Sequence, residues 1–139
     1  GDTVLDVAAG LATLAEYLQK KGLHVAATDF GPVQSWPRKS IPYVQLDLNQ
    51  PQIPVDAIIQ QLGGPPKAIV LRHVLEHVYE PAQLIALLAR LNPEFFLIMV
   101  PNGRSWFRYL FGKNFCLKSI NFCCGVFKTI PRKACLLRT

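Results

Sequence analysis

The sequence predicts an α/β fold in which helices cover a doubly wound parallel sheet. Short apolar segments alternate with segments whose apolar residues recur every three or four positions, and this alternation is typical of parallel sheets. The expected strands are apolar almost throughout, as strands buried on both faces require. With 139 residues, half of them hydrophobic, the chain is long enough for one domain with its own core.

Residues 3–29 are the unit around which we expect the domain to be organised. Thr3–Val7 has the composition of a buried strand, and a turn of small residues follows it. The next segment has one apolar helical face, formed by Leu11, Leu14, Ala15 and Leu18. Gly22 is expected to end this helix. A second strand is expected at residues 24–28, with Asp29 directly after it.

The rest of the domain is expected to alternate in the same way. Residues 30–41 contain two prolines and predict only a short or irregular helix. Three more strands are expected at residues 43–46, 68–71 and 95–100. One further helix has a buried face formed by Val55, Ile58, Ile59 and Leu62. Another begins near Pro81 and has a buried face formed by Leu84, Leu87, Leu88 and Leu91.

The turn after the first strand and the carboxylate after the second predict a nucleoside site. A tight turn from a strand into a helix directs backbone N–H groups toward an anion. A carboxylate at the tip of the next strand can accept both hydroxyls of a ribose. The dinucleotide pattern would need glycines at positions 8, 10 and 13, where this chain has Ala8, Gly10 and Thr13. An NAD-dependent oxidoreductase is therefore disfavoured.

Two motifs resemble those of the Rossmann-like, class I S-adenosylmethionine-dependent methyltransferases. Residues 6–12, Asp-Val-Ala-Ala-Gly-Leu-Ala, resemble motif I, which reads roughly D-h-G-x-G-x-G. Residues 72–81, Arg-His-Val-Leu-Glu-His-Val-Tyr-Glu-Pro, resemble the signature h-L-E-H-h-x-[DE]-P. The resemblance covers about residues 3–115, and with the right-handed crossover rule it implies the strand order 3-2-1-4-5.

The resemblance implies S-adenosylmethionine as the methyl donor, with an unidentified small-molecule or macromolecular acceptor. The implied donor-binding residues are Asp6, Ala8, Ala9, Gly10, Asp29, Phe30, Asp47, Leu48 and Arg72. Asp47 matches the acidic residue that meets the adenine amino group. The candidate catalytic residues are His73, Glu76 and His77. Because alanine replaces two motif glycines, we expect only position 10 of the turn to need a positive φ.

The same three residues also spell two metal motifs. His73, Glu76 and His77 form H-x-x-E-H, a zinc-protease pattern that the α/β frame disfavours. Some relatives hold a divalent metal with E-x-x-E-H, but the first glutamate is His73 here. The preferred interpretation is that no metal binds and that Glu76 and His77 have a structural role, bonding nearby backbone. A cofactor-free Rossmann-like module that binds a protein partner is the alternative for the whole chain.

Charge and cysteines separate the C-terminal segment from the rest. Residues 1–103 carry 7 Lys/Arg and 9 Asp/Glu, whereas residues 104–139 carry 8 Lys/Arg and no acid. All four cysteines lie at positions 116–135, without zinc-finger spacing, and predict free thiols in the cytoplasm. We expect a methyltransferase domain at residues 1–115 and a poorly packed tail at residues 116–139.

The ends of the sequence lead to three further expectations. The chain begins directly on a strand, so we expect a fragment truncated at both ends that lacks the C-terminal strands of the fold. The fifth strand would then be an exposed edge. No apolar run approaches the length of a membrane span, and the core composition does not indicate nucleic-acid binding.

Overall fold

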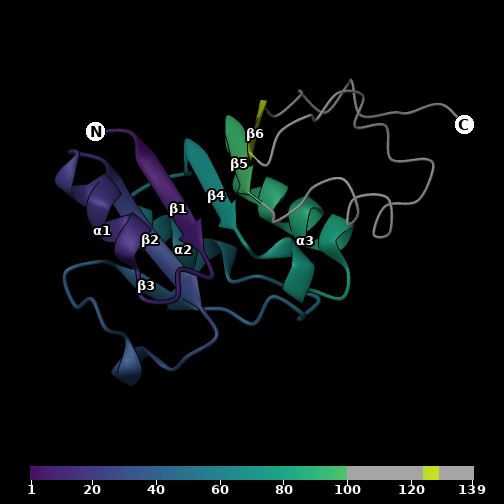
Figure 1. Ribbon diagram of the computed structural model, residues 1–139, viewed down its shortest axis with the longest axis horizontal. Helices are drawn as coiled ribbons and strands as arrows, with labels where there is room; N and C mark the ends of the chain where they lie inside the picture. Colours follow the sequence, from purple (N-terminus) through teal and green to yellow (C-terminus); the bar gives the residue numbers. More distant parts are fainter. Residues whose placement is uncertain (100–123, 129–139) are drawn as a thin grey trace, which may run out of the picture.

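The computed structural model describes residues 1–99 and 124–128, which form one twisted sheet flanked by helices (Figure 1). The strands are β1 Thr3–Val7, β2 His24–Asp29, β3 Tyr43–Gln45, β4 Ala68–Arg72, β5 Phe95–Met99 and β6 Cys124–Lys128. The α-helices are α1 Thr13–Lys20, α2 Val55–Leu62 and α3 Pro81–Leu88. Three short 3-10 helices lie between these elements: η1 Val33–Ser35, η2 Leu75–His77 and η3 Ala89–Leu91.

The first five strands lie in the order β3-β2-β1-β4-β5, and every pair among them is parallel. The predicted order 3-2-1-4-5 is therefore confirmed. Leu5 of β1 pairs with Ala26 of β2 on one side and with Ile69 of β4 on the other. The chain direction across the sheet reverses between β1 and β4, and in open sheets of this kind ligands bind beyond the carboxyl ends of the strands at that point.

A sixth strand corrects two expectations about the C-terminal part. β6 pairs antiparallel with β5, with Met99 opposite Cys124 and Phe95 opposite Lys128. The predictions that no further strand follows and that the fifth strand is an exposed edge are therefore wrong. The ladder along β5 satisfies backbone groups that an open edge would leave unpaired. The domain boundary at residue 115 stays a prediction, because most of residues 116–139 lie outside the described residues.

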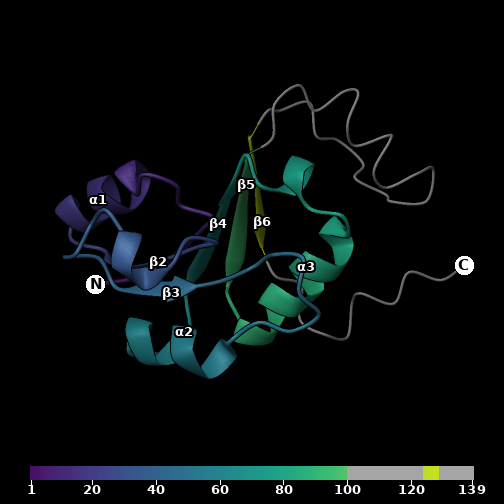
Figure 2. The ribbon, with the colours of Figure 1, turned by 90° about the horizontal axis from the view of Figure 1, so that it is seen from below.

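Helices cover the two faces of the sheet unequally (Figure 2). On one face, α2 and α3 bury a large apolar cluster that includes Leu5, Ile69 and Leu71, none of which is exposed to solvent. On the other face, α1 covers a smaller cluster that includes Val4, Ala15 and Val70. Alternate residues of each strand face opposite sides, so the continuous apolar strands supply both clusters.

One residue of the predicted first helix does not belong to it. Leu11 lies in the turn before α1, and 73% of its surface is exposed. The buried face of α1 instead rests on Ala15, with Leu14 and Leu18 half-buried. The helix begins two residues later than the periodicity suggests, because residues 8–12 adopt a turn whose backbone hydrogen bonds are not helical.

Candidate functional site

The turn between β1 and α1 is fixed by the carboxylate that follows β2. The backbone N–H of Gly10 donates to Oδ2 of Asp29 over 2.7 Å, and the N–H of Phe30 donates to Oδ1 over 2.8 Å. The N–H of Ala9 donates to the carbonyl of Thr28 over 2.9 Å. The structure thus brings together the predicted turn residues and Asp29, which are 19 positions apart in sequence.

Three residues of this turn have left-handed backbone conformations. The φ angles are +53° at Ala8, +57° at Gly10 and +55° at Ala12. The expectation of a positive φ at position 10 is confirmed, but the expectation that positions 8 and 12 avoid it is wrong. A left-handed conformation costs a non-glycine residue roughly 1–2 kcal/mol. The hydrogen bonds that close the turn hold these alanines in it nevertheless, so strain is stored beside the site.

Restoring glycine should stabilise the domain. Ala8→Gly and Ala12→Gly each relieve roughly 1–2 kcal/mol of strain, while the added freedom of the unfolded chain costs roughly 0.4–1 kcal/mol. We expect each variant to raise the free energy of unfolding by about 0.5–1 kcal/mol in urea titrations. Ala9→Gly is the control, because Ala9 is buried without a positive φ. It should destabilise the domain, and an equal gain from all three variants would contradict the strain argument.

Asp6 lies at the end of β1 and is almost fully buried, with 2% of its surface exposed. Burial raises the pKa of its carboxyl group to about 6, and the nearby Arg72 guanidinium and the N–H of Ala15 oppose that rise. Within the described part of the chain, Oδ2 of Asp6 has no hydrogen-bond partner. A buried carboxylate oxygen without a donor is costly, so this atom is suited to bind a cationic group of a ligand.

Three further predicted donor-binding residues lie at the next two strand ends. Phe30 is 69% exposed, directly after the Asp29 carboxylate. The N–H of Leu46 donates to the carbonyl of Asp29, which fixes the start of the loop carrying Asp47 and Leu48. Oδ1 of Asp47 accepts the N–H of Asn49 over 3.0 Å, and Leu48 is half-buried against the core. The side chain of Asp47 therefore stabilises the loop in which it lies.

An aromatic wall beside Asp29 is a feature that the sequence analysis missed. The rings of Trp36 and Tyr43 stack with centroids 4.3 Å apart. The hydroxyl of Tyr43 shares its one hydrogen between the carbonyls of Asp29 and Gly31. Burial, followed by the Asp29 charge, raises the pKa of Tyr43. The wall borders a cleft of about 250 Å³ that Gly10 and Asp29 also line. The signal available in the sequence for this wall was a pair of aromatic residues, Trp36 within a loop that contains prolines and Tyr43 directly after it.

The candidate catalytic residues follow β4. His73 has a φ of +56°, and its Nδ1 lies 3.4 Å from Oε1 of Glu76. Oε2 of Glu76 is buried without a hydrogen-bond partner among the described residues. His77 is exposed, and its backbone N–H donates to the carbonyl of Val74. Of the three predicted residues, the structure therefore joins His73 with Glu76. The described residues contain no group of three His, Cys, Asp or Glu side chains arranged to hold a metal.

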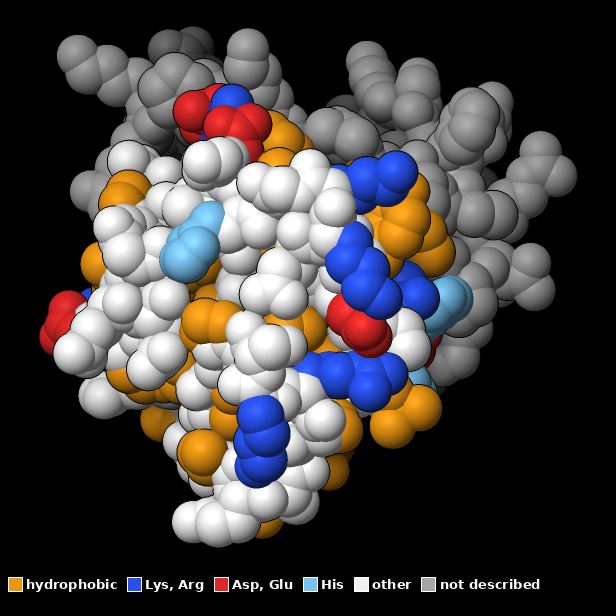
Figure 3. Space-filling model, turned by 90° about the vertical axis from the view of Figure 1, so that its left-hand side faces the viewer, with side chains coloured by type: hydrophobic (Ala, Val, Ile, Leu, Met, Phe, Trp, Pro, Cys, Tyr) orange, Lys and Arg blue, Asp and Glu red, His pale blue; other side chains and the backbone are white. Residues whose placement is uncertain are grey.

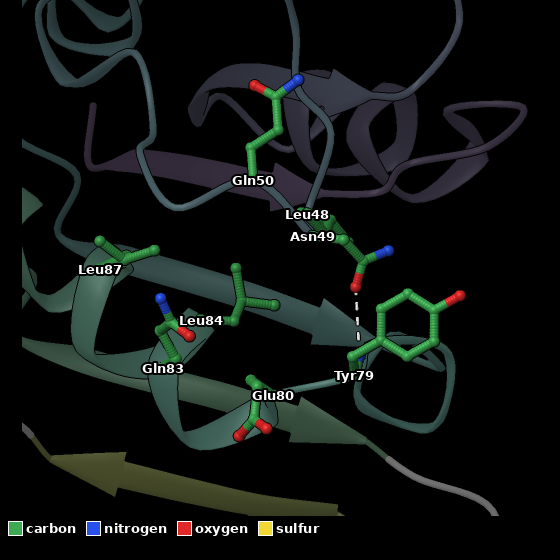
Figure 4. A pocket seen from close by; sticks show the side chains of 8 residues that line it. All are labelled: Leu48, Asn49, Gln50, Tyr79, Glu80, Gln83, Leu84 and Leu87. Carbon is green, nitrogen blue, oxygen red and sulfur yellow. Dashed lines mark hydrogen bonds between the residues drawn. The ribbon is translucent and has the colours of Figure 1, made fainter.

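A hydrogen bond ties the loop after β3 to the segment before α3. Oδ1 of Asn49 accepts the backbone N–H of Tyr79 over 3.1 Å (Figure 4). Beside this bond lies a small pocket of about 50 Å³, bordered by Leu48, Leu84 and Leu87. The pocket is too small for a nucleoside. The bond between Asn49 and Tyr79 has a structural role, because it joins the two loops.

Charged side chains gather on the side of the domain that carries α1 (Figure 3). Glu16 of α1 contacts Lys20 over 2.9 Å and Arg38 over 3.1 Å. The Glu16–Arg38 contact joins the loop after β2 to the helix. Lys20 is largely exposed, so the pair it forms with Glu16 contributes little to stability.

The fold and the site together define a class of protein. A parallel sheet of this order, with a turn of small residues after β1 and a carboxylate after β2, defines an α/β domain of the doubly wound type. Residues 1–124 match the family described as a methyltransferase domain. The chain belongs to this methyltransferase domain family.

Solved structures with the same fold agree with this assignment. An S-adenosylmethionine-dependent methyltransferase from Mesorhizobium loti is 16% identical, with a TM-score of 0.58 over 72% of this chain and 47% of that chain. A TehB-like SAM-dependent methyltransferase from Corynebacterium glutamicum is 25% identical, with a TM-score of 0.57 over 76% and 58%. The glycopeptide N-methyltransferase MtfA, complexed with sinefungin, is 19% identical, with a TM-score of 0.54 over 70% and 43%.

The comparisons also mark the extent of the similarity. The chain spans about half the length of these solved relatives. A search of curated proteins found no match. Among residues 1–99 and 124–128, no helix has the length and apolar character needed to cross a membrane.

Proposed function

We propose that this domain binds S-adenosylmethionine and transfers its methyl group to an acceptor. The observation that carries the proposal is the Asp6 carboxylate, buried at the switch point of the sheet with one oxygen that has no donor among the described residues. The family and the named donors of the solved relatives support the same reaction. When bound, S-adenosylmethionine supplies an activated methyl group on a sulfonium centre.

The residues of this chain fit the chemical groups of that donor. Asp6 can accept hydrogen bonds from the ammonium group, and Arg72 can pair with the carboxylate. The carboxylate of Asp29 keeps lone pairs for the ribose hydroxyls after binding the N–H groups of Gly10 and Phe30. A Cβ at position 10 would meet no atom of the described residues within 4 Å, so these residues leave the space beside the turn open.

The remaining donor-binding residues act at the adenine end and in the turn. Phe30 and Leu48 offer apolar surfaces for the ring, and Asp47 offers an acceptor for its amino group. Ala8 and Ala9 contribute backbone to the turn and allow a ligand to approach it closely. We place catalysis at His73, Glu76 and His77, next to this site in sequence and at the same edge of the sheet.

Asp6→Asn should change stability and ligand binding in opposite directions. The folded protein keeps a proton on Asp6 up to a pKa of about 6, against 3.8 as the ordinary value. The contribution of Asp6 to the free energy of unfolding is therefore largest below about pH 4. It falls by about 3 kcal/mol as the pH rises through 6. Asparagine removes that loss, so urea unfolding at pH 7 should show a more stable variant.

Binding of S-adenosylhomocysteine should weaken in the same variant. Loss of a charged acceptor for the ammonium group should reduce affinity about 10- to 100-fold. Isothermal titration at pH 5 and pH 8 should show tighter binding by the parent at pH 8, where Asp6 is ionised, and a smaller pH effect in Asp6→Asn. A stable parent domain that binds no S-adenosylhomocysteine at millimolar concentration would overturn the proposed function.

Acceptor and location belong to the same proposal. The acceptor is a small molecule or a macromolecule that reaches the carboxyl edge of the sheet. A cytoplasmic location is expected from the cysteines, which fit free thiols in a reducing compartment.

A further inference from the structure

His73 lies just beyond the carboxyl end of β4, at the switch point of the sheet. β4 pairs with β1 up to Leu71 and Val7, so His73 lies two residues beyond the last pair, beside the small-residue turn. On the other side, the backbone N–H of His73 donates to the carbonyl of Met99 over 2.8 Å. The hydrogen bond to β5 therefore fixes the backbone position of this residue.

The backbone conformation of His73 is strained. Its φ of +56° places a non-glycine residue in the left-handed region, at a cost of roughly 1–2 kcal/mol. Strain of this kind is concentrated at functional sites. About half of the His73 side chain remains exposed at the strand end. The strain thus accompanies an imidazole that a bound molecule can reach.

Glu76 contacts the Nδ1 edge of the His73 imidazole. Its Oε1 lies 3.4 Å from Nδ1 of His73, and its side chain is only 10% exposed. An ionised carboxylate accepts hydrogen bonds and cannot donate them. The contact therefore favours the tautomer with the proton on Nδ1, which leaves the lone pair of Nε2 free to accept a proton.

We propose that His73 is the proton acceptor of the methyl transfer and that Glu76 is its positioning residue. This inference rests on the proposed function. The acceptor is then a neutral nucleophile that carries a hydrogen, either a hydroxyl or an amine. Its lone pair forms the new bond to the methyl carbon, the electrons of the carbon–sulfur bond stay on sulfur, and its proton passes to Nε2 of His73.

Chemical modification of the histidines tests the position of His73. Diethyl pyrocarbonate acylates unprotonated imidazole, and mass spectrometry can follow each of the three histidines in the full chain. S-adenosylhomocysteine at about ten times its Kd should slow modification of His73 about tenfold, because the free fraction falls as 1/(1 + [L]/Kd). His24 starts β2 at the opposite end of the sheet and is the internal control.

The tautomer tests the role of Glu76. ¹⁵N NMR of the parent near pH 8 should show neutral His73 with its proton on Nδ1. Glu76→Gln should shift the population toward the Nε2-protonated form, whereas the matched control Glu80→Gln, at an exposed neighbouring acid, should leave it unchanged. An unchanged tautomer in Glu76→Gln would overturn the positioning role.

The outcomes separate this inference from the proposed function. Isothermal titration that detects no S-adenosylhomocysteine binding would overturn the proposed function and the role of His73 with it. If S-adenosylhomocysteine binds but slows modification of His73 no more than that of His24, the role of His73 alone would be overturned. Protection of His73 by Mg²⁺ without S-adenosylhomocysteine would assign the residue to metal binding instead.

Discussion

Gly10→Val is expected to abolish binding of S-adenosylhomocysteine by an otherwise folded domain. Gly10 has a φ of +57°, and its N–H donates to Asp29 over 2.7 Å. A β-branched residue cannot adopt this conformation without strain above the roughly 1–2 kcal/mol of an ordinary side chain. The turn should rearrange and release Asp29. The valine side chain at position 10 should also enter the space proposed for the donor. Affinity should fall by about 100-fold or more.

A second glycine provides the matched control for this prediction. Gly22 has a φ of +86° after α1, at the opposite end of the sheet, and a Cβ there would also meet no atom within 4 Å in the part of the chain that the structure describes. Gly22→Val should lower the melting temperature to a similar extent but keep binding in isothermal titration. Equal loss of binding in both variants would mean that stability, not the turn, controls the ligand site.

Leu88→Ala is expected to have the largest effect on stability. Leu88 of α3 is fully buried in the larger apolar cluster. Removing three carbon atoms leaves a cavity that the packed sheet cannot refill, which costs about 2–5 kcal/mol. This is a large share of the roughly 5–15 kcal/mol that stabilises a typical domain. Urea denaturation should show the loss directly.

The neighbouring residue of α3 tests whether burial causes that loss. Leu87 is only half-buried against the same cluster. Leu87→Ala removes the same atoms and has the same effect on helix propensity, so a clearly smaller loss is expected. Similar losses in the two variants would show that the helix itself, and not its packing, limits stability.

The sequence by itself determined the elements and their order. Apolar strands such as Phe95–Met99 and the i, i+3, i+4 pattern of Val55–Leu62 depend on local periodicity, which a sequence displays directly. The parallel order then followed from the family motifs and from the handedness of the crossovers. The pairing of Asp29 with the small-residue turn was also foreseeable, because both lie at strand ends that meet.

Only the tertiary structure decided the backbone of the site and its contacts. Alanine at positions 8 and 12 suggested ordinary backbone angles, but long-range hydrogen bonds to β2 hold the turn and leave both residues left-handed. The antiparallel pairing of β6 with β5 joins residues separated by a long segment with no clear periodicity. The contact between His73 and Glu76 depends on where β4 ends and on the 3-10 turn after it. Each of these features is set by interactions between distant residues, which composition and periodicity do not encode.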